Sequence, residues 1–174
     1  FKSRSRLDST DPATRLRALT LKGLNHELKL LRPWVTMGRF VETRSTRSEG
    51  SVVSVLQARR SRLAIILAQG VGQQHVLAPF AAGPVSFDLF GIPATDRLYA
   101  ISVTGPRELR RHHGPRITHE DPDRVSLIAL TEDPAVRNHI AQYASQNGRE
   151  MVELRTELLR GALEQTRNVD QSIA

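Results

Sequence analysis

The sequence has no cysteine, few aromatic residues and no long apolar run. Without cysteine there is no disulfide, no thiolate nucleophile and no cysteine-ligated metal. Aromatic residues make up 5% of the chain, too few to argue for the exposed platforms on which sugar-binding modules rest. The longest apolar runs are far shorter than the roughly 20 residues of a membrane-spanning helix. No apolar stretch follows the first basic residues, so the sequence predicts neither a membrane span nor a signal peptide.

What remains is an ordinary globular composition with an excess of positive charge. Hydrophobic residues make up 39% of the 174 residues and charged residues 25%, as in a single folded domain. Lys and Arg number 25 against 18 acidic residues, for a net charge of +7. The excess lies mostly in residues 1–60, which would attract phosphate groups or face an acidic protein neighbour. Because the chain begins with Phe1 and not Met, we expect it to be part of a longer polypeptide.

The first structured element is predicted to be a connecting helix within residues 11–35. Residues 1–10 are polar and basic, and we expect a linker or the end of an upstream domain there. The Asp11 side chain can cap free backbone N–H groups of a helix that begins at Pro12. Proline suits the first helical position because the N–H that it lacks has no hydrogen-bond partner there. Pro33 disfavours a helical conformation at the residue before it, so the helix should end there. A leucine stripe, expected to be buried on this domain or on an upstream one, comprises Leu16, Leu19, Leu24, Leu28 and Leu31.

Residues 36–132 are predicted to form a β-sandwich. About seven short β-branched runs bounded by turn signals predict strands at 52–56, 62–67, 85–89, 98–103, 109–111, 116–119 and 125–130. A further strand could begin at 40–43, and turns are expected at 57–62 and 104–106. Parallel pairing needs crossover segments of a dozen residues or more, so this uninterrupted order favours antiparallel pairing.

Residues 133–174 are predicted to form a C-terminal helical extension with two helices. Asp133 repeats the capping signal before a proline, and Asn147-Gly148 is expected to end the first helix near Tyr143. The second helix should bury a stripe that begins with Met151 and Leu154. The expected fold class is therefore mainly β with flanking helices (α+β). It is an antiparallel β-sandwich preceded by one helix and followed by two C-terminal helices.

Gly70-Val71-Gly72 follows an apolar strand, as a dinucleotide-binding turn would. The third glycine of that motif would fall at position 75, which is His75. Asp88 and Asp96, the candidate ribose carboxylates, both lie in the β region. A hairpin loop explains the segment better, so we expect no cofactor there.

A candidate metal site comprises His112, His113, His119, Glu120, Asp121 and Asp123. Adjacent histidines on a strand point to opposite faces, and the spacing matches no established ligand pattern. A polar hairpin tip explains this cluster equally well. Whether Asp88 or His112, His113 and His119 have a role is left open.

The sequence gives little support for other kinds of catalytic or binding site. The sequence has no G-x-S-x-G or H-E-x-x-H motif, and Asp88 is a lone strand carboxylate, not one of a pair. Trp34, at the helix end, is expected to pack against the sandwich. The basic run at 39–47 contains only one aromatic residue, Phe40, and no recognition helix is apparent. We therefore assign no catalytic, cofactor-binding or metal-binding residue.

Several segments resemble bacterial glycoside-hydrolase-like multidomain proteins. Residues 8–15, followed by LNHELKLLRPW at 24–34, resemble the join between their catalytic barrel and C-terminal accessory region. Residues 98–110 resemble their final hairpin, and 125–134 their last strand entering a helix. The closing helices, through 154–170, also fit. The resemblance covers nearly the whole chain and departs from the pattern at 110–113, and all its motifs are structural.

The resemblance implies a non-catalytic accessory domain that packs on an upstream catalytic domain of the same polypeptide. Carbohydrate binding would then be weak or absent, and the location extracytoplasmic. One alternative is a basic nucleic-acid-binding module, whose affinity would fall steeply with salt. Another is an assembly module that pairs through the C-terminal helices, although Gly148 and Gly161 interrupt their stripe.

Overall fold

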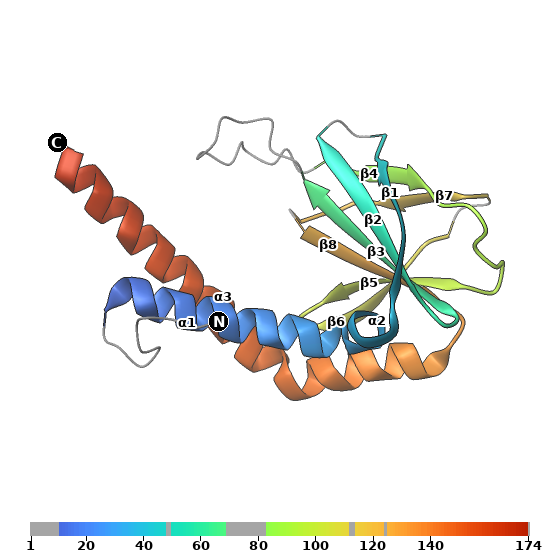
Figure 1. Cartoon of the computed structure of the whole chain (residues 1–174), viewed down its shortest axis with the longest axis horizontal. Coiled ribbons are helices and arrows are strands. Elements are labelled where there is room, and N and C mark those ends of the chain that lie inside the picture. The colour runs from blue at the N-terminus through green and yellow to red at the C-terminus, as the bar shows by residue number, and fades with distance from the viewer. Residues whose placement is uncertain (1–10, 48–49, 69–82, 112–113, 124, 174) are drawn as a thin grey trace.

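The computed structural model describes residues 11–47, 50–68, 83–111, 114–123 and 125–173, with side chains of the last helix described to residue 164. Figure 1 shows a β domain whose helices run along one side and continue beyond it.

The main sheet has six antiparallel strands in the order β1-β2-β3-β8-β5-β6. Strand β8, the last in the chain, lies between β3 and β5. Along β2, buried and partly buried residues alternate, because successive side chains point to opposite faces of a sheet. The strands are β1 (Arg39–Ser45), β2 (Ser51–Ala58), β3 (Ser61–Ala68), β5 (Arg97–Ser102), β6 (Gly105–Leu109) and β8 (Val125–Thr131).

A second, two-stranded sheet covers one face of the main sheet. It pairs β4 (Val85–Asp88) with β7 (Arg116–His119). Phe87 and Ile117 from this sheet share one buried core with Val55, Ile66 and Ile128 from the main sheet. The two sheets thus enclose an apolar core as the layers of a sandwich do. The predicted fold class, antiparallel β with flanking helices, is confirmed.

Helices cover the other face of the main sheet (Figure 1). They are α1 (Pro12–Leu30), α2 (Arg32–Met37) and α3 (Pro134–Ile173). A second core joins Trp34 and Ile140 of the helices to Leu63, Tyr99 and Ala129 of the sheet. The predicted cap is also present, since the carboxylate of Asp11 accepts the Thr14 backbone N–H at 2.9 Å.

Several helix, strand and turn boundaries differ from the prediction. The turn expected at 57–62 is shorter, because β2 ends at Ala58 and β3 begins at Ser61, and the strand expected at 109–111 has only Leu109, the end of β6. Pro33 does not end the helical region but lies in the first turn of the separate helix α2, a position that proline tolerates. Strand β6 begins at Gly105, where we expected a turn at 104–106. The turn is tighter because Gly105 has a φ of 114°, a conformation that glycine adopts at little cost, and pairs directly with Ser102.

The predicted break at Asn147-Gly148 is wrong, because α3 is a single helix of 40 residues. The Asn147 side chain donates a hydrogen bond to the Tyr143 carbonyl at 3.0 Å, one turn back. Gly148 lies against the β5–β6 turn, and a Cβ at this position would be only 2.6 Å from the Val103 carbonyl oxygen. Gly148 thus permits close packing of the helix on the hairpin, and the local signal for a break does not show this contact.

Candidate functional site

The histidine cluster does not form a metal site in the described part of the chain. His112 and His113 lie outside the described residues, as does the glycine-containing segment 70–75. Among the residues that the structure describes, no three His, Asp or Glu side chains are grouped to hold a metal ion. His119 is the one histidine of the cluster that is placed, and it is buried in β7.

His119 is 5% exposed, and its Nδ1 atom has no hydrogen-bond partner among the described residues. Burial lowers the pKa of His119, and the nearby Arg107 charge lowers it further. Asp121 and Asp123 act in the opposite direction with smaller effect. Burial and the Arg107 charge both favour the neutral form of the side chain.

Asp88 is an ion-paired structural carboxylate. Its Oδ2 atom accepts a hydrogen bond from Arg47 at 2.5 Å, and Arg116 of the paired strand β7 lies 3.7 Å from Oδ1. These arginines hold the pKa of Asp88 below its ordinary value, mainly through the Arg47 hydrogen bond. Asp88 thus links β4, β7 and the segment after β1, and no second carboxylate pairs with it in the described structure.

Asp96 is buried in the loop before β5, and burial raises its pKa. Arg111 fastens this loop by donating to the carbonyl oxygens of Pro93 at 2.5 Å and Asp96 at 2.9 Å. A surface depression of about 500 Å³ lies beside it, but its Arg97 is 3.8 Å from Glu108. The charges here serve mainly to hold the loop and hairpin together.

The aromatic residues with polar tips do not form a sugar-binding platform. Trp34 is 1% exposed, and its ring N–H donates to the Ser61 hydroxyl at 3.1 Å. Tyr99 is also buried, and Tyr143 is half-buried with its hydroxyl 2.9 Å from Nδ1 of His26. The expectation that Trp34 packs against the sandwich is confirmed.

The basic run at 39–47 is largely engaged in contacts within the domain. Arg44 donates to Glu42 at 2.6 Å and stacks over Phe90 with its guanidinium carbon 5.4 Å from the ring centre. Arg47 pairs with Asp88. These arginines would have to give up partners before they could bind phosphate.

The most distinctive surface is where α1 crosses α3, which we call the helical arm, comprising α1 and residues 149–164 of α3 (Figure 1). Lys22 lies 2.7 Å from Glu150, and this hydrogen bond raises the pKa of Lys22 and lowers that of Glu150. His26 connects Glu150, at 3.6 Å, to the Tyr143 hydroxyl. This polar network connects α1 to α3.

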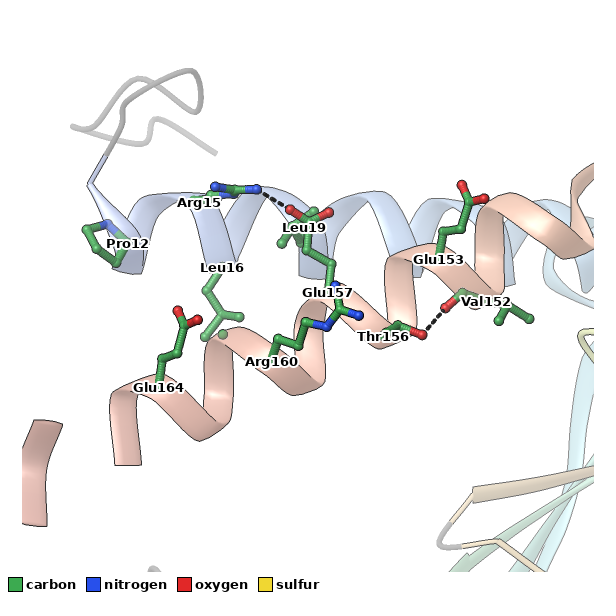
Figure 2. Close-up of a pocket in the computed structure, with 11 residues that line it drawn as sticks. Pro12, Arg15, Leu16, Leu19, Val152, Glu153, Thr156, Glu157, Arg160 and Glu164 are labelled. Atoms are coloured by element: carbon green, nitrogen blue, oxygen red, sulfur yellow. Dashed lines mark hydrogen bonds and ion pairs between the residues drawn. The ribbon is translucent and has the colours of Figure 1, made fainter. Parts of the chain in front are cut away.

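One groove of the helical arm is polar at its rim (Figure 2). Its volume is about 600 Å³. Leu16 and Leu19 of α1 line it together with α3, and Arg15 forms an ion pair with Glu157 across it. The helices are close here because Gly161 lacks a side chain, and a Cβ would lie 3.1 Å from Leu16.

A second groove between the same helices is apolar, with a volume of about 260 Å³. Met151, Leu154 and Leu158 of α3 line it opposite Gly23 and Leu24 of α1. We call it the apolar groove.

Beside the apolar groove, α1 presents a row of exposed leucines, which we call the outer leucine row. Leu21 is 47% exposed, Leu24 49% and Leu28 42%. Three and four residues separate them, so they share one face of the helix. The outer leucine row therefore lies on the surface of the helical arm.

The predicted leucine stripe is thus divided between two faces of α1. Leu16 and Leu19 face α3 and are partly buried, whereas Leu24 and Leu28 are exposed. Burial of all five leucines on this domain, one of the two placements we expected, is wrong. The sequence analysis also missed Leu21, although its spacing to Leu24 and Leu28 is the signal that would have identified the row.

No described helix is both long and apolar enough to cross a membrane. The sequence matches no protein-family model and no curated protein. Among solved structures, the chain has a weak likeness to the crystal structure of a GH30 endoxylanase from Clostridium papyrosolvens C71, with a TM-score of 0.38 and 12% identity. That match covers 55% of this chain and 24% of the endoxylanase chain, so it spans about a quarter of that protein's length.

Proposed function

We propose that this chain is a non-catalytic accessory domain of a larger carbohydrate-active, glycoside-hydrolase-like protein, and that it packs on the catalytic domain through the helical arm. The outer leucine row beside the apolar groove is the observation that carries this proposal. Asp88, the lone strand carboxylate, is ion-paired with Arg47, and Asp96 is buried in the loop before β5.

The outer leucine row suits a docking surface. Full burial of a leucine stabilises a protein by about 1.5–3 kcal/mol, and each of these three is still nearly half exposed. Covering them would add roughly 1 kcal/mol each. The neighbouring groove would extend the contact, as in the apolar centre of an interface between domains.

The two alternative functions fit the described surface less well. A nucleic-acid-binding module needs basic groups interleaved with stacking aromatic residues, and in the basic run at 39–47 Arg44 and Arg47 are paired with Glu42 and Asp88. An assembly module that pairs through the C-terminal helices would need their apolar stripe, but Met151 and Leu154 of that stripe are already buried within this chain.

The test is to determine the coding sequence upstream of Phe1 and to compare hydrogen exchange in two proteins, the 174-residue chain and the longer polypeptide. We expect a catalytic-domain-sized region upstream, and slower exchange of the α1 amides in the longer polypeptide. Strands β3 and β8 serve as the internal control, because they are central in the sheet in both proteins. The purified 174-residue chain should hydrolyse no glycoside.

Two results would contradict the proposal. A start codon a few residues before Phe1 would leave no catalytic domain for this chain to pack on. Equal exchange of the α1 amides in both proteins would show that the arm is not covered. Glycoside turnover by the 174-residue chain, lost on substitution of one of its own residues, would equally overturn the non-catalytic assignment.

A further inference from the structure

We draw no further inference here: the strongest candidate, the apolar groove between α1 and α3 with the outer leucine row beside it, belongs to the surface that carries the proposed function, and nothing in the described structure shows what covers it.

Discussion

His119 is the residue at which stability should depend most directly on pH near neutrality. It is buried, its Nδ1 has no hydrogen-bond partner in the part of the chain that the structure describes, and burial lowers its pKa from the ordinary value of 6.5. The unfolded chain therefore takes up this proton first as the pH falls. The contribution of His119 should be fully present above about pH 6.5 and be lost progressively below it, as protonation pulls the equilibrium towards the unfolded state.

The measurement is the thermal midpoint of the chain and of His119→Gln between pH 7.5 and 5. Glutamine keeps a polar tip but has no proton to gain, so the variant should lose less stability over this range. The ion-paired Asp88 provides the contrast, since its lowered pKa places its effect at much lower pH. Parallel pH profiles for the chain and His119→Gln would contradict the assignment.

At the scale of elements, the two glycines of α3, Gly148 and Gly161, should respond to substitution with opposite sign. Alanine stabilises a helix by about 1 kcal/mol relative to glycine. At Gly148 the added Cβ would lie 2.6 Å from the Val103 carbonyl oxygen, which belongs to the backbone of the β5–β6 turn. Gly148→Ala should therefore cost about 1–3 kcal/mol in the free energy of unfolding, despite the better helix propensity.

Gly161→Ala is the matched control in the same helix. Its Cβ would meet only the end of the Leu16 side chain, at 3.1 Å, which can move aside. This variant should be neutral or stabilised by up to about 1 kcal/mol. Urea denaturation of both variants measures these changes in the free energy of unfolding. A stabilised Gly148→Ala would mean that α3 does not pack against the hairpin as closely as the structure shows.

Sequence reasoning succeeded where the signal is local. The carboxylate of Asp11 caps α1 as predicted, and the run of short strands between residues 36 and 132 pairs antiparallel. It failed where the cause is a distant contact. From the sequence alone, Gly148 indicates a helix break, and only the fold shows that it lies beside the carbonyl of Val103.

The candidate site was less predictable than the fold. Spacing alone places a leucine on a face of α1 but does not say which face meets α3, so Leu24 and Leu28 were expected to lie with Leu16. The position of α3 separates them. Likewise, Asp88 is a lone carboxylate in the sequence, and only the fold brings Arg47 and Arg116 to it.

At the scale of the whole molecule, the main sheet is covered on both faces, by β4–β7 on one and the helices on the other. The outer leucine row lies beyond these layers and takes no part in either core. The three side chains are already about half buried, and serine forms helices less well than leucine, so substituting all three with serine should lower the thermal midpoint of the isolated chain by several degrees. This loss is the baseline against which an effect on docking is measured.

In the longer polypeptide the same triple variant should behave differently. A partner that binds only the folded domain stabilises it by mass action, so the domain should melt at a higher temperature there than alone. Leu21→Ser, Leu24→Ser and Leu28→Ser together should remove that difference. Leu159→Ser with Leu163→Ser, on exposed positions of α3 outside the apolar groove, should retain it. Calorimetry of the isolated chain, the longer polypeptide and its two variants measures these melting temperatures directly. If the domain melts at one temperature in both contexts, the helical arm does not couple it to its neighbour.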